Sequence, residues 1–196
     1  MTRGPRYKRS FRRRHDGKTD YHKRLKLLKS RKLRVVIRAS NDHIQVQITQ
    51  SKFGGDNILV SAFSKELTSK YGWTANSGNI PAAYLTGYLA GLRAKAKKIQ
   101  EAIFDLGIFY HRNRVLAACK GIIDTGINIP YREEFFPEGI DERIKGIHIE
   151  NYAKNLKTNE PEQYEQIFSG YLKKKLNPLN LSKIFANSLK MIENKA

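Results

Sequence analysis

The chain has 196 residues, a mass of 22.6 kDa and a net charge of +19, from 37 Lys and Arg side chains against 18 Asp and Glu. With 40% hydrophobic and 10% aromatic residues, it is too apolar for a disordered basic tail and long enough for one sizeable domain with appendages. This composition excludes a neutral, self-sufficient globule, because so large an excess of one sign attracts polyanions at long range. Nucleic acid and an anionic membrane are the two candidate partners.

The sequence favours neither a membrane nor an oxidising compartment. The longest apolar run covers 82–92, which is eleven residues, whereas a spanning helix needs about 20. No apolar stretch follows the basic N-terminus, so we expect no secretory signal. The single cysteine, Cys119, excludes an intramolecular disulfide and a zinc site built on cysteines. Its apolar neighbours favour a small buried side chain over a nucleophile.

The positive charge is concentrated at the N-terminus. Residues 1–34 hold 15 Lys and Arg against two Asp, whereas residues 35–196 hold 22 basic side chains against 16 acidic ones. Within 1–18 the basic side chains alternate with aromatic ones and show no helical apolar period. We interpret 1–18 as an RNA-binding arm that orders on its target, because arginines fork onto phosphate oxygens and aromatic rings stack on bases. A disordered solubilising tail or a nuclear localisation signal is the alternative.

A helix and three strands are predicted next along the chain. From Thr19, a candidate N-cap, an apolar stripe at helical spacing predicts a helix that ends near Lys32. The runs 33–40 and 43–49 alternate apolar and polar residues and are joined by turn residues, which predicts a β-hairpin. A third strand over 58–63 follows a glycine-rich turn. The more polar face of this sheet is either solvated or in contact with RNA.

Helices and one further strand alternate through the rest of the chain. The predicted elements are a short helix over 64–71, a long helix that opens near Pro81, a strand over 102–106, a helix over 115–123, and terminal helices over about 160–175 and 181–194. Gly87 and Gly91 lie four residues apart, and we expect these small residues to let the long helix lie close to the sheet. Strands separated by helices favour a layered α/β sheet over a helical bundle.

No motif in the chain selects an enzyme. Residues 16–19 (DGKT) end like a phosphate-binding loop, but the first glycine of that motif is absent and no strand precedes it. The five histidines show no zinc-ligand spacing. Four aspartates near strand or helix ends would suit a two-metal nuclease if they gathered, but the residue type is also typical of turns and caps. These aspartates are Asp42, Asp56, Asp105 and Asp124.

Five blocks of sequence, in order, resemble one protein family. The blocks are 11–48 (FRRRHDGKTDYHKRLKLLKSRKLRVVIRASNDHIQVQI), 72–91 (GW with NSGNIPAAYLTGYLAG), 101–108 (EAIFDLGI), 114–130 (RVLAACKGIIDTGINIP) and 142–152 (ERIKGIHIENY). Over roughly residues 1–155 the chain resembles the archaeal and eukaryotic branch of the universal large-subunit ribosomal protein family that binds 5S rRNA, the L-eighteen family. Two places depart from the family's pattern, the 107–113 loop with Arg112 and Asn113, and Tyr131.

The resemblance implies a non-enzymatic structural protein that attaches 5S rRNA to 23S rRNA in the central protuberance, beside neighbouring large-subunit ribosomal proteins. It implies a cytoplasmic location, with no cofactor, metal, membrane or small-molecule substrate. The implied fold is α/β, a three-layer sandwich with a mixed sheet of the ribonuclease-H-like type seen in the translational machinery, with a basic N-terminal arm and a C-terminal helical extension. We expect the arm over 1–18, the 5S rRNA-binding domain over 19–155 and the extension over 156–196.

The basic arm and the resemblance together assign rRNA contacts to 19 side chains. These are Arg3, Arg6, Tyr7, Lys8, Arg9, Phe11, Arg12, Arg13, Arg14, Lys18, Thr19, Tyr21, Lys23, Arg24, Arg38, Asn41, Trp73, Asn76 and Asn79. Two alternatives stay open at this point. A non-specific, chromatin-like DNA-binding protein would share the charge but would bind duplex DNA equally well, and a nuclease would show metal-dependent cleavage.

Overall fold

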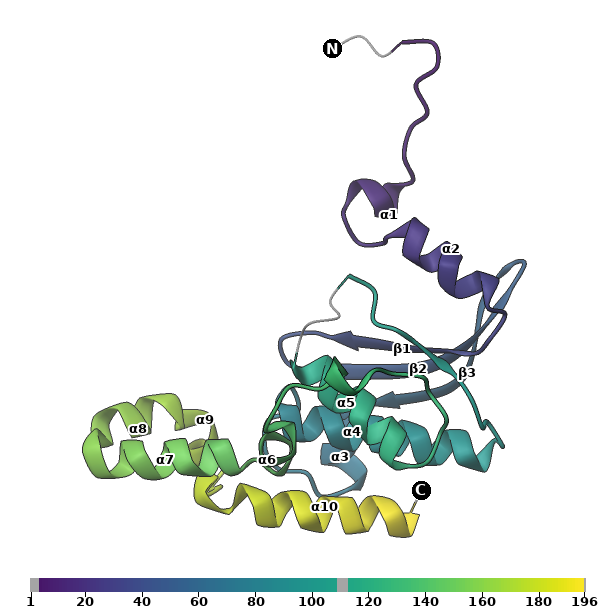
Figure 1. Cartoon of the computed structure of the whole chain (residues 1–196). Coiled ribbons are helices and arrows are strands. Elements are labelled where there is room, and N and C mark those ends of the chain that lie inside the picture. The colour runs from purple at the N-terminus through teal and green to yellow at the C-terminus, as the bar shows by residue number, and fades with distance from the viewer. Residues whose placement is uncertain (1–3, 109–112, 196) are drawn as a thin grey trace.

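The computed structural model describes residues 4–108 and 113–195, and its centre is a mixed four-stranded sheet (Figure 1). The strands are β1 (Arg34–Ala39), β2 (Ile44–Lys52), β3 (Gly55–Phe63) and β4 (Ile103–Asp105), in the spatial order β3-β2-β1-β4. β1, β2 and β3 pair antiparallel, and β4 pairs parallel to β1. The predicted hairpin and later short strand are confirmed, whereas the third strand begins at Gly55 instead of residue 58, because Gly55, Asp56 and Asn57 pair with β2. The fold is α/β with a mixed open sheet.

Alternation along the strands separates the two faces of this sheet. Val35 and Ile37 of β1 lie opposite Ile48 and Val46 of β2, and all four are at most 1% exposed. Burial of each such side chain stabilises the fold by about 1.5–3 kcal/mol. The intervening residues of β1, among them Arg34, point to the opposite face. The strand therefore offers an apolar face to the core and an arginine-bearing face to the other side.

Helices cover both faces of the sheet. Four of them are α2 (Tyr21–Lys29), α3 (Ser64–Lys70), α4 (Ile80–Ala96) and α5 (Asn113–Asp124). Figure 1 shows α4 and α5 against the apolar face of the sheet and α2 over the opposite face. All four lie where the sequence predicts helices.

The start of α2 differs from the prediction by one residue. Asp20, rather than Thr19, is the N-cap, and its Oδ1 accepts hydrogen bonds from the backbone N–H groups of His22 (2.9 Å) and Lys23 (3.1 Å). The bond from Lys23 is the largest cause of the lowered pKa of Asp20. Asp caps helices better than Thr does. The Thr19 hydroxyl is instead engaged by the arm.

Glycines set the distance between α4 and α5. A Cβ at Gly87 would lie well under 3.0 Å from the Ala118 carbonyl oxygen of α5. A Cβ at Gly121 would likewise lie well under 3.0 Å from the Tyr84 carbonyl oxygen of α4. Gly91 likewise faces the segment that follows α5. The expectation that Gly87 and Gly91 bring α4 close to the sheet is therefore wrong, because these residues bring α4 close to α5.

Gly121→Ala is expected to lower the free energy of unfolding by about 2–3 kcal/mol, because the new methyl group meets backbone that cannot rotate away. Gly170→Ala is the matched control, since nothing lies within 4 Å of a Cβ built there. That change should be neutral or should stabilise by up to about 1 kcal/mol. Urea unfolding of both variants checks the contrast, and equal stabilities would contradict the close approach of α4 and α5.

The C-terminal part is helical but divided differently from the prediction. Its elements are the 3-10 turn η1 (Glu133–Phe135), α6 (Ile140–Lys145), α7 (Ile147–Asn159), α8 (Pro161–Ile167), α9 (Ser169–Lys173), the 3-10 turn η2 (Pro178–Asn180) and α10 (Leu181–Lys195). The predicted helix over 160–175 is two short helices that break at Phe168, whereas α10 matches its prediction and α7 was not predicted. Ala153, Leu156 and Phe168 form a small core of their own. Across the described ranges 4–108 and 113–195, no helix is both long and apolar enough to cross a bilayer.

Candidate nucleic-acid interface

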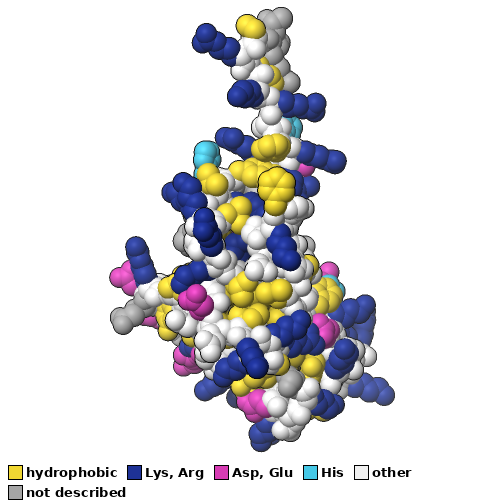
Figure 2. All heavy atoms as spheres, turned by 90° about the vertical axis from the view of Figure 1, so that its right-hand side faces the viewer, with side chains coloured by type: hydrophobic (Ala, Val, Ile, Leu, Met, Phe, Trp, Pro, Cys, Tyr) yellow, Lys and Arg dark blue, Asp and Glu magenta, His cyan; other side chains and the backbone are white. Residues whose placement is uncertain are grey.

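Residues 4–18 project from the body and carry the densest positive charge (Figure 1). All of these residues are exposed. Figure 2 shows Lys and Arg along this arm almost to the exclusion of Asp and Glu, whereas both signs mix on the lower body. The predicted contact residues that the structure places here are Arg6, Tyr7, Lys8, Arg9, Phe11, Arg12, Arg13, Arg14 and Lys18. The remaining predicted arm residue, Arg3, lies outside the described residues.

Arg13 and Phe11 of the arm contact the residues at the start of α2. A short helix, α1 (Arg12–His15), places Arg13 so that its Nε donates to the Thr19 hydroxyl oxygen at 2.9 Å. The rings of Phe11 and Tyr21 meet with centroids 5.3 Å apart. Phe11 is still 71% exposed, so most of its ring stays open to a nucleobase. The arm and α2 therefore form one continuous basic and aromatic surface.

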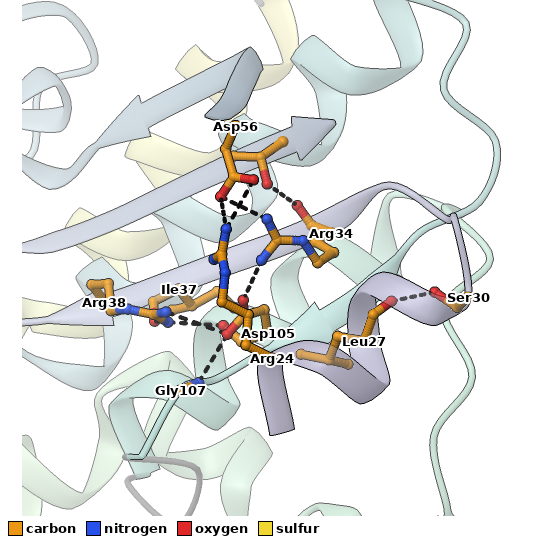
Figure 3. Close-up of polar contacts among 10 residues, drawn as sticks. Arg24, Leu27, Ser30, Arg34, Ile37, Arg38, Asp56, Asp105 and Gly107 are labelled. Carbon is orange, nitrogen blue, oxygen red and sulfur yellow. Dashed lines mark hydrogen bonds and ion pairs between the residues drawn. The ribbon is translucent and has the colours of Figure 1, made fainter. Parts of the chain in front are cut away.

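A chain of ion pairs ties α2 to the sheet beneath it (Figure 3). Asp56 pairs with Arg24 at 3.0 Å and with Arg34 at 2.6 Å. Asp105 pairs with Arg34 at 2.7 Å and with Arg38 at 3.3 Å. Arg34, at the middle, is 1% exposed, and such a guanidinium is tolerated only where carboxylates compensate the loss of water. We call these five residues, from α2, β1, β3 and β4, the arginine–aspartate network.

The two ends of the network remain accessible. The side chains of Arg24 and Arg38 are 34% and 44% exposed, so each can offer N–H groups to a phosphate while it stays paired. Three guanidinium groups face two carboxylates, which leaves the network with one net positive charge. The structure thus gathers four predicted residues on the α2 side of the sheet: Tyr21, Lys23, Arg24 and Arg38.

Acid is expected to weaken the fold through two paired carboxylates. Burial raises the pKa of Asp56, but hydrogen bonds from Arg34 and Arg24 outweigh it and leave the pKa below its usual 3.8. Burial also raises the pKa of Glu66, and Arg93 outweighs it, so that pKa lies below 4.5. Such groups contribute stability above their unfolded pKa, and that stability is lost as the pH falls through the folded pKa.

We therefore expect the free energy of unfolding to fall as the pH drops below about 4.5, and to fall less steeply in Glu66→Gln. Glu66 pairs with Arg93 at 2.6 Å, and the amide removes the titrating charge while it keeps one carbonyl oxygen as an acceptor. Chemical denaturation at successive pH values measures both slopes. Identical slopes for the two proteins would contradict a role for Glu66.

The four aspartates weighed for a nuclease do not gather into one cluster, although Asp56 and Asp105 share Arg34. Asp56 and Asp105 are neutralised within the network, Asp124 accepts a hydrogen bond from the Tyr84 hydroxyl at 2.8 Å, and Asp42 lies in the turn between β1 and β2. Within the part of the chain that the structure describes, no group of three or more His, Cys, Asp or Glu could hold a metal ion.

The turn between β1 and β2 is held against the start of α5. One nitrogen of Arg114, Nη1, donates to the backbone carbonyls of Ser40 (2.6 Å), Asn41 (3.2 Å) and Gly78 (3.0 Å). Asn41 itself is exposed. Its predicted contact with rRNA therefore stays sterically open.

In the loop before α4, the three predicted contact residues make hydrogen bonds within the protein. Trp73 is 0% exposed, and its Nε1 donates to the Asn76 carbonyl at 3.1 Å. The Oδ1 of Asn76 accepts from the Gly78 N–H at 2.8 Å, and Asn79 caps α4. Trp73 offers no face to a nucleobase, so stacking on it is incompatible with this structure. We leave Trp73 out of the interface, whereas Asn76 is exposed and Asn79 is partly exposed, so their predicted contacts stay predictions.

A hollow of about 880 Å³ lies between α2, β4 and the segment 130–135. Its lining brings together seven predicted residues: Arg13, Lys18, Thr19, Tyr21, Lys23, Arg24 and Arg38. Lys26 and Tyr131 also line it; neither is among the 19 predicted contact residues, and Tyr131 is one of the two places where the chain departs from the family's pattern. For Lys26 a signal existed, because it lies three residues after Lys23 and so shares a face of α2 with it. The hollow itself depends on how α2 sits over the sheet.

Comparison with known proteins gives two kinds of match. A family model described as "Ribosomal large subunit proteins 60S L5, and 50S L18" matches residues 5–105. The large ribosomal subunit protein uL18 of Aeropyrum pernix is 45% identical over 185 residues, which cover 92% of this chain and 85% of that protein. The protein of the same name from Korarchaeum cryptofilum is 48% identical over 194 residues, covering 98% of this chain and 97% of its own.

Proposed function

The chain belongs to the family of large-subunit ribosomal proteins 60S L5 and 50S L18, and from this premise we propose that it binds 5S rRNA and attaches it to 23S rRNA in the central protuberance. Family membership makes the chain a structural, non-enzymatic component of the large ribosomal subunit, in the cytoplasm. The nuclease alternative is thereby set aside.

The observation that supports RNA binding is the exposed arm that continues into α2. Residues 1–18 hold eight Lys and Arg against one Asp, and those the structure describes are open to solvent. Each cation that meets a phosphate releases a condensed counterion, which gives a strong, salt-dependent attraction. The exposed Phe11 ring adds a surface on which an unpaired base can stack. Together these groups suit a folded RNA that offers both phosphates and splayed bases.

We assign the 5S rRNA contacts to the arm, to the exposed side of α2, to the accessible ends of Arg24 and Arg38, and to Asn41. We also propose that the body is a three-layer sandwich of the ribonuclease-H-like type. The mixed sheet, with helices on both faces, supports this fold. The predicted boundary between residues 155 and 156 falls inside α7, which is one continuous helix. We therefore propose that the C-terminal extension begins with α7. Neighbouring large-subunit proteins are the further partners we propose.

Competition between 5S rRNA and duplex DNA tests the proposal. The full chain is titrated with labelled 5S rRNA in Mg²⁺ at salt concentrations from about 0.05 to 0.2 M, with unlabelled duplex DNA as competitor. An unrelated structured RNA of equal length is the second competitor. We expect 5S rRNA to resist displacement by both. Equal affinity for all three polymers would overturn the proposal in favour of non-specific nucleic-acid binding.

A further inference from the structure

The hollow beneath α2 has the size of a ligand site. Its volume of about 880 Å³ lies within the range of roughly 300–1,000 Å³ that protein pockets for small ligands span. α2 forms one side, and β4 together with the segment 130–135 forms the other. Because the α2 side of the hollow and Arg38 belong to the proposed RNA interface, whatever fills the hollow is in reach of bound rRNA.

Apolar and aromatic groups contribute to the lining. Leu27 of α2, Ile103 of β4 and Pro130 supply apolar surface, and Tyr21 and Tyr131 supply aromatic rings. Tyr131 is 50% exposed, although its ring contacts that of Phe136 with centroids 5.4 Å apart. A large aromatic side chain left half open in this way is a stacking platform for a flat ring.

The charged part of the lining is positive. It holds six basic side chains, which are Arg13, Lys18, Lys23, Arg24, Lys26 and Arg38. Only two carboxylates line it, and both are already engaged, Asp20 in capping α2 and Asp105 in the arginine–aspartate network. Arg24 and Arg38 are themselves paired in the network and Lys18 lies 3.5 Å from Asp16, yet the lining as a whole stays positive and attracts an anionic occupant. The chemistry that fits is therefore a flat ring that carries phosphate, which is a nucleotide.

We propose that the hollow receives a nucleobase that bound rRNA turns out of its stack, with the base against Tyr131 and its flanking phosphates on the basic residues of the lining. This inference rests on the proposed function and adds to it a defined site for one unpaired nucleotide. Unpaired bases in loops and bulges are the parts of structured RNA that can leave the stack at low cost. A specific pocket of this kind gives selectivity that phosphate contacts alone do not.

The test compares full-chain Tyr131→Ala, Tyr131→Phe and Tyr152→Ala. Tyr152 lies on α7, is 49% exposed and does not line the hollow, so its loss controls for removal of a surface tyrosine. We expect Tyr131→Ala to weaken 5S rRNA binding by about tenfold with an unchanged salt slope, because stacking and not charge is lost. Tyr131→Phe keeps the ring and should bind like the original chain, as should Tyr152→Ala. Thermal unfolding confirms that the variants fold.

Chemical probing of the RNA completes the test. With the original chain, at least one unpaired base should become protected, and the same base should regain reactivity in the Tyr131→Ala complex. Unchanged affinity of Tyr131→Ala, or no base whose protection depends on Tyr131, would overturn the inference. Thermal stabilisation of the chain by a nucleoside monophosphate alone, without such a base, would assign the hollow to free nucleotides and overturn it equally. Failure of the original chain to prefer 5S rRNA is a separate result that bears on the proposed function.

Discussion

Removal of residues 1–18 is expected to lower the affinity of the chain for 5S rRNA by about a hundredfold at physiological salt, and to flatten the dependence of affinity on salt. The deleted segment holds eight Lys and Arg. If half of them meet phosphates, the slope of log affinity against log salt falls by about three, since each phosphate contact contributes roughly 0.7–0.9. Binding titrations at several salt concentrations measure both quantities for the full and shortened chains.

Two controls make this result specific to charge. A full-length variant with the eight basic residues of 1–18 changed to Gln keeps the length of the arm and should reproduce the loss. The shortened chain should unfold at nearly the same urea concentration as the full one, because the described arm residues are exposed and none belongs to the buried core, although the Arg13–Thr19 and Phe11–Tyr21 contacts are lost. Undiminished RNA affinity after truncation would contradict the assignment of the interface to the arm.

The second large effect is expected for Asp105→Ala, which should lower the free energy of unfolding by about 3–5 kcal/mol. This carboxylate lies beside the buried Arg34, and its removal leaves a guanidinium that is 1% exposed with Asp56 as its sole remaining partner in the network. Arg38 loses its ion pair at the same time. Arg34→Met should cost less, because Asp105 keeps Arg38 and Asp56 keeps Arg24. Urea denaturation of both variants measures the asymmetry.

Glu101→Ala is the matched control for Asp105→Ala. It also removes a carboxylate from an ion pair, with Lys32 at 2.9 Å, but the two side chains are 58% and 44% exposed. Exposed pairs of this kind contribute about 0–1 kcal/mol. A loss for Asp105→Ala no larger than that for Glu101→Ala would show that the network does not stabilise the fold.

Local patterns predict the sheet and the helices that pack on it. The period-two alternation in 33–40 and 43–49 identifies the buried faces of β1 and β2 because one face must be apolar. The breaks among the C-terminal helices are harder to predict. The chain between α6 and α7 turns at Gly146, which has φ of 81°. Gly146 also lies against Leu181, a contact between residues 35 positions apart that no local window contains.

The candidate site can be predicted from the sequence only in part, for a similar reason. Charge counting finds the arm, because a concentration of Arg and Lys is a local property. Arg34 looks like one more residue of a polar strand face, and its burial follows from Asp56 and Asp105, which lie 22 and 71 positions further along the chain. Trp73 stands among Gly, Asn and Ser and so reads as a loop residue, yet tertiary packing encloses it completely. Whether a side chain is reachable is decided by contacts that are distant in sequence.

Because Asp105 follows Arg34 by 71 positions, the two residues are also synthesised at different times. At a synthesis rate of about 5–20 residues per second, Asp105 is added roughly 4–14 s after Arg34. In the later part of this interval β2 and Asp56 have been made but β4 has not, so Asp56 is the one carboxylate of the network that Arg34 can meet. The arm, by contrast, is complete first and needs no later residue for its charge. A newly made chain is therefore attractive to polyanions before its body can close, and completion of β4 is the step that anchors the finished sheet beneath α2.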